Sequence, residues 1–295
     1  MKGWLGYAAY RTLSGLFGLL PEPAVRRLGS GIGRASSYVL GERKRLIRRH
    51  LTRVLGEPPP PRLVRDAFAS YGRYWAEVFW VRPRRKAAFV ASAEVEGMQN
   101  VRDAVDAGNG LIMGLIHSGN WEVAGSMAEE VGLKALAVVE GLKNERIVAW
   151  FKWCRESMGI DVVVAHKGSA VTRDLLKKLR DGGMIALVSD RDVGGRGVPV
   201  IFFGEETTMP AGPAALADKT GAALLPVGNF FKDGPGHRIV VGSPIEIPTG
   251  LGDKTERIAE ITQRLAHAYE DLIRQSPQDW HIFLENWPSD AKDES

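Results

Sequence analysis

The sequence predicts an α/β protein: a mixed, largely parallel central sheet flanked by helices, preceded by an N-terminal amphipathic helical region. From residue 94 onward, short apolar runs alternate with amphipathic stretches of helical length, a pattern typical of parallel strands joined by crossover helices. Residues 1–90 instead combine aromatic and arginine-rich helical patterns. With 295 residues and 44% hydrophobic content, the chain can bury a large core. We therefore expect a helical region over 1–90 and an α/β domain over 91–295, packed as one compact unit.

The first predicted helix is the apolar stretch 3–20, which is interrupted by Arg11 and ended by Pro21. A membrane-spanning helix needs about 20 apolar residues with few charges, and this stretch is slightly short with a charge at its middle. Aromatic residues and a snorkelling arginine suit a helix that lies in the membrane interface. No small-residue cleavage site follows it, so we expect no signal peptide.

Basic residues are concentrated in the same N-terminal region. Residues 1–90 hold 18 Lys and Arg against 5 Asp and Glu, a net charge of +13, whereas the rest of the chain carries −9. Six of these cations lie between Arg43 and Arg53, interleaved with leucine and isoleucine. The pattern favours docking on an anionic membrane surface. Core helices with a solvated basic side are the alternative, and no nucleic-acid motif is present to support binding of DNA or RNA.

A second helix is predicted after the proline tract 58–61. Its apolar residues recur at helical spacing: Leu63, Phe68, Tyr71, Trp75, Val78 and Phe79. Such a stripe is most often core, and it can also form the wall of an acyl-chain tunnel.

The predicted elements of the α/β body follow in order. The helices are expected at 101–108, 121–132, 144–159, 169–183 and 255–277. The strands are expected at 110–116, 135–140, 161–165, 184–190, 198–204, 223–231 and 237–247. Ligand chemistry in an open α/β sheet gathers beyond the carboxyl ends of the strands. His117 follows one such end, and Asp190, Arg191 and Asp192 lie at another.

The sequence HSGNWE, residues 117–122, forms the turn after the strand at 110–116. Ser118 or Asn120 can cap the next helix, and Glu122 falls in its first turn, where an acid suits the helix dipole. His117 is then either a satisfied loop histidine or a general base oriented by a carboxylate.

Other catalytic chemistries have little support in the sequence. No Gly-x-Ser-x-Gly nucleophile elbow is present. Cys154, the single cysteine, lies in a predicted helix and is interpreted as structural, and it excludes a disulfide framework. The spacing around His117 does not match a zinc-binding His-Glu-x-x-His pattern. We expect no metal and no prosthetic group.

HSGNWE resembles the His-x4-Asp/Glu motif of glycerolipid acyltransferases. Further stretches make the chain similar to the branch that comprises lipid A biosynthesis acyltransferases and phosphatidylinositol mannoside acyltransferases. They are SYGRYWAEVF (70–79), AVVEGLKNE (137–145), FKWCRESMGIDV (151–162), the region 189–227 and DWHIFLENW (279–287). The segment FFGEETTMPAGPAALA and the chain length favour the mannoside subfamily.

The resemblance implies an enzyme on the cytoplasmic face of the cell membrane, peripheral or monotopic. It would move a long acyl chain from acyl-CoA, or from acyl carrier protein, to a sugar hydroxyl of a glycolipid. A lipid A type acceptor and a non-catalytic lipid-binding relative are the alternatives. His117 matches the catalytic histidine, Glu122 the motif acid and Asp190 an acid that can partner the histidine. Glu140 and Arg155 match polar positions near the reaction centre.

These matches suggest a direct transfer in which His117 deprotonates the acceptor and either Asp190 or Glu122 orients the imidazole. Substrate contacts are expected from Ser118, Asn120, Glu140, Arg155 and Arg191. Backbone N–H groups near Ser118 to Asn120, or Arg155, would stabilise the oxyanion. Arg155 can instead form an ion pair with a nearby acid. Arg191 either contacts substrate or pairs structurally with Asp192. Apolar walls from the N-terminal helices are expected to hold the acyl chain.

Overall fold

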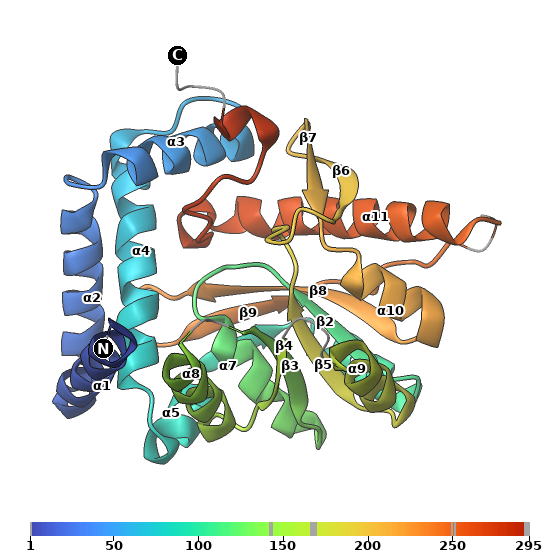
Figure 1. Ribbon diagram of the computed structural model, residues 1–295, viewed down its shortest axis with the longest axis horizontal. Coiled ribbons are helices and arrows are strands. Elements are labelled where there is room, and N and C mark those ends of the chain that lie inside the picture. The colour runs from blue at the N-terminus through green and yellow to red at the C-terminus, as the bar shows by residue number, and fades with distance from the viewer. Residues whose placement is uncertain (1, 142–143, 166–169, 249, 251, 292–295) are drawn as a thin grey trace.

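A computed structural model describes residues 2–141, 144–165, 170–248, 250 and 252–291. Its centre is a seven-stranded sheet with the order β1-β9-β8-β2-β5-β3-β4 (Figure 1). The strands of this sheet are β1 (Ala93–Glu96), β2 (Leu111–Leu115), β3 (Ala135–Glu140), β4 (Asp161–Ala165), β5 (Met184–Val188), β8 (Ala223–Phe231) and β9 (His237–Val241). β8, β2, β5, β3 and β4 are parallel, and β9 turns back antiparallel to β8. The predicted α/β class with a mixed, largely parallel sheet is confirmed.

Helices cover both faces of the sheet. They are α5 (Lys86–Ala91), α6 (Met98–Asp106), α7 (Trp121–Ser126), α8 (Glu145–Ser157), α9 (Val171–Arg180), α10 (Gly212–Thr220) and α11 (Lys254–Gln275). Ile112 of β2 packs in a core with α9, α10 and α11, whereas Leu111 and Met113 pack in a second core with α6 and α7. β2 is buried along its whole length because both of its faces are covered.

Several elements differ from the sequence prediction: β1 and α10 were not expected, and the strand expected at 237–247 ends at Val241. The strand expected at 198–204 is β6 (Val198–Phe202), but it pairs with β7 (Glu205–Met209) in a separate antiparallel hairpin outside the main sheet. The helix expected at 121–132 is split, because α7 is followed by a 3-10 turn over Met127–Val131. The chain continues beyond α11, and residues 276–291 run back across the sheet edge toward α3 (Figure 1).

The N-terminal region consists of α1 (Lys2–Leu19), α2 (Glu22–Ser36), α3 (Gly41–Leu55) and α4 (Pro61–Trp80), stacked beside the sheet in Figure 1. α2 and α4 touch backbone to backbone, since a Cβ on Gly33 would lie 2.1 Å from the Phe68 carbonyl oxygen. Tyr10 of α1 packs edge-on against Trp150 of α8 with ring centroids 5.4 Å apart, so these helices share a core with the α/β body. No helix in the described part of the chain is long and apolar enough to cross a membrane.

Candidate functional site

His117 and Asp190 meet because of the strand register. Leu115 at the end of β2 pairs with Val188 at the end of the parallel neighbour β5, so the residues two positions further along each chain lie side by side. The His117 Nδ1 atom lies 2.5 Å from Asp190 Oδ1. The backbone N–H of His117 also donates to Asp190 Oδ2 at 2.9 Å. The two acid–base candidates at neighbouring strand ends therefore form one hydrogen-bonded pair.

Asp190 is fully buried and remains a carboxylate. Burial disfavours its charge, but the charge on His117 and hydrogen bonds from the His117 ring and Trp280 outweigh burial and hold the pKa of Asp190 below its usual range. Trp280 Nε1 donates to Asp190 Oδ2 at 2.8 Å. Because a carboxylate only accepts hydrogen bonds, the His117 proton is placed on Nδ1. The Nε2 lone pair is then available on the 30% exposed side chain.

The HSGNWE turn is held by buried contacts. Gly119 has φ +50°, and a Cβ there would lie 2.4 Å from the Asn229 carbonyl oxygen. Ser118 Oγ accepts the Asn229 N–H at 3.0 Å, and Asn120 Nδ2 donates to Glu77 Oε2 at 3.0 Å. The side chains of Ser118 and Asn120 are fully buried. The structure therefore gives both residues a scaffolding role where we had expected substrate contact.

The expected cap is corrected, and two of the three expected backbone oxyanion donors, those of Ser118 and Gly119, are occupied. Asn120 occupies the N-cap position of α7, but its side chain makes no capping hydrogen bond. The N–H groups of His117, Ser118 and Gly119 already donate to Asp190, to the Ile116 carbonyl and to the Asp279 carbonyl. Those three groups are unavailable to an oxyanion.

Glu122 does not contact the imidazole of His117. Its carboxylate pairs with Arg155 of α8, with Nη2 at 2.7 Å and Nε at 2.9 Å. The choice between Asp190 and Glu122 as partner of His117 is thus resolved in favour of Asp190, and Arg155 adopts the ion pair that was one of its two predicted roles. Arg155 still lines the same cavity as His117. Cys154, beside this pair, is buried, and burial together with Glu122 raises the pKa of its thiol to about 12, so the thiol is unreactive.

Arg191 and Asp192 are not paired with each other. Asp192 accepts hydrogen bonds from the N–H groups of Gly194 and Gly197 and from Thr208. Arg191 lines the His117 cavity, and its buried Nε has no hydrogen-bond partner among the described residues. Arg191 therefore does not form the structural ion pair with Asp192 that was one of its two expected roles. Glu140 ends β3, but its side chain falls outside the described residues.

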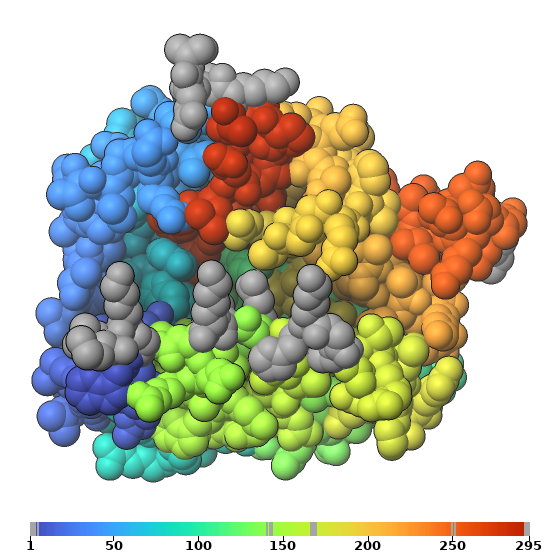
Figure 2. Space-filling view, in the orientation of Figure 1, coloured from blue at the N-terminus to red at the C-terminus, as the bar shows by residue number. Residues whose placement is uncertain are grey.

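His117 opens into a cavity of about 770 Å³ above the carboxyl ends of the strands. Figure 2 shows this face of the molecule hollowed between the chain that leads to β6 and β7 and the helices below it. The walls are mostly apolar, and the cations Arg155, Arg191, Lys219 and Lys254 lie on the lining. The described lining residues come from positions 117–254, whereas we expected the N-terminal helices to supply this wall. Those helices line a separate cavity.

Residues 279–287, which follow α11 and had been noted only for their resemblance to the family, also form part of the site. The His281 N–H donates to the His117 carbonyl at 2.7 Å, and Ser118 pairs with Trp280 in an isolated β-bridge. Burial, reinforced by His117, lowers the pKa of His281 to about 3, so its imidazole is neutral. The available signal was the cluster of Trp280, His281 and Trp287 just after a long amphipathic helix.

The described residues contain no group of three or more His, Cys, Asp or Glu side chains placed to hold a metal ion. The site consists of an ordered His–Asp pair, an apolar cavity and a few cations. An α/β protein with such a site has the features that suit an apolar ligand with an anionic part.

The chain belongs to the bacterial lipid A biosynthesis acyltransferase family, whose sequence profile matches residues 2–289. It is 39% identical to the phosphatidylinositol mannoside acyltransferase of Mycolicibacterium smegmatis over 253 residues, which are 84% of this chain and 81% of the relative. The corresponding protein of Mycobacterium tuberculosis is 36% identical over 280 residues, 93% of this chain and 86% of the relative. The Escherichia coli lipid A biosynthesis lauroyltransferase is 26% identical over 239 residues, 76% of this chain and 74% of the relative. The resemblance read from the sequence is confirmed, and the protein is an acyltransferase.

Proposed function

We propose that the protein transfers a long fatty acyl chain from acyl-CoA to a sugar hydroxyl of a phosphatidylinositol mannoside, at an anionic membrane surface. The observation that carries this proposal is the His117–Asp190 pair at the mouth of an apolar cavity. The 36–39% identity to phosphatidylinositol mannoside acyltransferases favours that acceptor over a lipid A type acceptor.

The reaction is a direct transfer. His117 Nε2 takes the proton of the acceptor hydroxyl, and the hydroxyl oxygen forms a bond to the thioester carbonyl carbon. The carbon–sulfur bond then breaks, and the imidazolium returns its proton to the CoA sulfur. The Asp190 carboxylate at Nδ1 stabilises the imidazolium between these steps. General-base assistance of this kind contributes about 10²–10⁴-fold.

The charges on the cavity wall suit the donor. Arg191, Lys219 and Lys254 are cations on the lining, and the phosphates of CoA are anions. Arg155 has five N–H groups, more than its pairing with Glu122 uses. It remains the candidate for the oxyanion, because the backbone donors of residues 117–119 are occupied. The apolar walls would enclose the acyl chain.

Membrane docking is supported by an N-terminal apolar surface. Of the fourteen large hydrophobic residues exposed in the described part of the chain, nine come from residues 1–40: Trp4, Leu13, Leu16, Leu19, Leu28, Ile32, Tyr38, Val39 and Leu40. Arg11 and Arg27 are exposed on the same helices, and Lys44 and Arg48 are exposed on the following helix, α3. Exposed apolar clusters of this size mark interaction sites, and nearby cations attract anionic lipids.

The decisive experiment compares the wild-type protein with His117→Ala. Acyl transfer from palmitoyl-CoA to phosphatidylinositol mannoside in vesicles should be abolished in the variant, while circular dichroism and vesicle co-sedimentation stay unchanged. Near-normal transfer by the variant would remove His117 from the mechanism. No turnover by the wild-type protein with any acceptor, mannoside or lipid A type, would favour a non-catalytic lipid-binding protein.

A matched pair of surface variants tests docking. Leu19→Glu alters a residue that is 82% exposed at the end of α1, and Ile201→Glu makes the same change at a 48% exposed residue of β6. Sedimentation with phosphatidylglycerol vesicles should weaken only for Leu19→Glu. Equal binding of both variants would contradict docking through the N-terminal apolar surface.

A further inference from the structure

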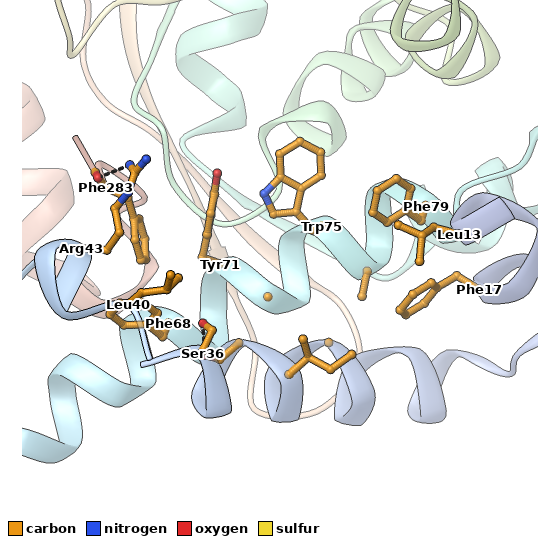
Figure 3. A pocket seen from close by; sticks show the side chains of 15 residues that line it. Leu13, Phe17, Ser36, Leu40, Arg43, Phe68, Tyr71, Trp75, Phe79 and Phe283 are labelled. Carbon is orange, nitrogen blue, oxygen red and sulfur yellow. Dashed lines mark hydrogen bonds between the residues drawn. The ribbon is translucent and has the colours of Figure 1, made fainter. Parts of the chain in front are cut away.

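A second cavity, of about 520 Å³, lies among α1, α2 and α4, and its described lining shares no residue with the His117 cavity. Figure 3 shows it from close by, with Arg43 and Phe283 at one end and Leu13 and Phe17 at the other. We call it the helix cavity. It is lined by Leu13, Phe17, Gly29, Ile32, Gly33, Ser36, Leu40, Arg43, Phe68, Tyr71, Gly72, Trp75, Ala76, Phe79 and Phe283.

The helix cavity follows from how α2 and α4 pack. A Cβ on Gly72 would lie 2.2 Å from the Gly29 carbonyl oxygen, so the two helices touch along glycine. A contact this close has no room for large side chains. Tyr71 and Trp75 therefore stand beside the contact, on the side of α4 away from α2 (Figure 3). With Phe79, they form an apolar wall that is exposed to the cavity.

A layer of aromatic rings separates the helix cavity from the His117 cavity. Tyr74 is buried and stacks on Trp121 with ring centroids 4.2 Å apart. Trp121 lines the His117 cavity, whereas Trp75, whose ring lies 5.4 Å from Tyr74, lines the helix cavity. A chain inside the helix cavity is therefore not the chain being transferred at His117, but it is held one aromatic layer away from it.

The mouth of the helix cavity lies within the N-terminal apolar surface. Leu13, Ile32 and Leu40 line the cavity and are also 39%, 62% and 45% exposed. The cations near the mouth are Arg43, which donates to the Phe283 carbonyl at 2.5 Å, and the exposed Lys44. An apolar slot with a cationic end is complementary to a lipid with an acyl tail and an anionic headgroup.

We propose that the helix cavity binds one acyl tail of the anionic glycolipid acceptor while the sugar of that lipid extends to His117. This inference rests on the proposed function. A tail in a bilayer is already out of water, so its move into an apolar slot yields little free energy. The helix cavity would instead orient the acceptor, because a tail held in one position limits the positions that the headgroup can take. Its effect should appear in kcat/KM for the membrane-bound acceptor, since a misplacement of the reacting hydroxyl by about 1 Å can lower the rate about 10²-fold.

Ile32→Trp and Ala35→Trp form a matched pair for the test. Both residues are exposed and apolar on α2, but only Ile32 lines the helix cavity. Ile32→Trp should lower kcat/KM for diacylated phosphatidylinositol mannoside by about 10–100-fold and leave transfer to the deacylated, water-soluble mannoside unchanged. Ala35→Trp should behave as wild type with both acceptors. The soluble acceptor also shows that each variant is folded.

A phosphatidylinositol mannoside with a diazirine in one tail provides the second measurement. Irradiation with the wild-type protein should label helix-cavity residues, and Ile32→Trp should abolish that labelling. Labels confined to residues outside the cavity, or equal kinetics of the two variants, would overturn the inference. Equal labelling by a phosphatidylglycerol carrying the same diazirine, with unaltered kinetics, would show a bulk-lipid site and would also overturn it. Failure of wild-type transfer to any acceptor would refute the proposed function instead.

Discussion

Replacement of Asp190 by Asn should change which ring nitrogen of His117 carries the proton. Asp190 Oδ2 accepts from two fixed donors, the His117 backbone N–H and Trp280 Nε1. The single oxygen of asparagine must occupy that position, because its NH2 group would meet two donors there. The NH2 group then faces His117 Nδ1, which can only accept from it. The ring proton therefore moves to Nε2, and the nitrogen that faces the acceptor loses its lone pair.

The expected fall in the rate of acyl transfer follows from the loss of the general base and of the carboxylate beside it. General-base assistance contributes about 10²–10⁴-fold, and the variant also loses the carboxylate that stabilises the imidazolium. An Asp-to-Asn change in a Ser–His–Asp triad costs about 10⁴-fold in kcat because the tautomer is wrong. We expect kcat/KM for Asp190→Asn to fall about 10³-fold, which corresponds to about 4 kcal/mol. Since both fixed donors stay satisfied, the fold should survive.

Initial rates of palmitoyl-CoA consumption with the mannoside acceptor measure this fall, and ¹⁵N NMR of the histidine rings reports the tautomer. Glu122→Gln is the comparison, because its carboxylate pairs with Arg155 and not with His117. It should leave the Nδ1-protonated tautomer in place. A rate for Asp190→Asn within about tenfold of wild type, with Nδ1 still protonated, would refute the reasoning. Loss of that tautomer in Glu122→Gln would identify Glu122 as the partner.

Two further predictions concern the C-terminal segment. Trp280→Phe removes one charge-assisted hydrogen bond from Asp190, about 1.5–3 kcal/mol, so the pKa of Asp190 should rise. A ¹³C NMR titration of the Asp190 carboxyl group measures this change, and an unshifted titration would contradict it. Asp290→Asn should lower the free energy of unfolding at pH 7 by about 3 kcal/mol. Burial opposes the Asp290 charge, but hydrogen bonds from His50 and backbone N–H groups hold its pKa well below the usual range. The wild type therefore loses this stability as the pH falls below about 4, and thermal melts of the variant should show a weaker acid dependence.

The sequence was sufficient to place His117 and Asp190 at one sheet edge, because both follow buried strands that read as parallel. It could not decide between Asp190 and Glu122. That choice depends on the register of β2 against β5, which sets Leu115 opposite Val188, and on the direction in which the first turn of α7 presents Glu122. Side-chain direction around a short helix depends on tertiary packing, here against Arg155 of α8.

The role of residues 276–291 could not be predicted for a different reason. This segment has no regular strand or α-helix in the structure, so no hydrophobic period marks it. Its position depends on side-chain hydrogen bonds to distant residues: Ser70 donates to Asp279 at 2.6 Å, and His50 contacts Asp290 at 3.0 Å. Such partners lie more than 200 positions apart in sequence.

These bonds tie the His–Asp pair to the N-terminal helices. α4 holds Asp279 and α3 holds Asp290, and the segment between these two acids carries Trp280, which contacts Asp190. Glu77 of α4 holds Asn120 in the turn after His117. Two of the N-terminal helices, α3 and α4, are thus part of the support for the proposed general base.

Residues 91–295 should therefore not fold alone, although their sequence pattern is that of an α/β domain. Without α3 and α4, Asp279 loses its bond to Ser70, Asp290 loses its bonds to His50 and Arg53, and apolar residues packed under these helices, such as Phe283, become exposed. Deletion of residues 2–20 is the control, because it removes α1 and keeps α3 and α4. Circular dichroism melts should show a cooperative transition for the control and none for 91–295. A cooperative, soluble 91–295 fragment with acyltransferase activity would show that the N-terminal helices are dispensable for the geometry of the site.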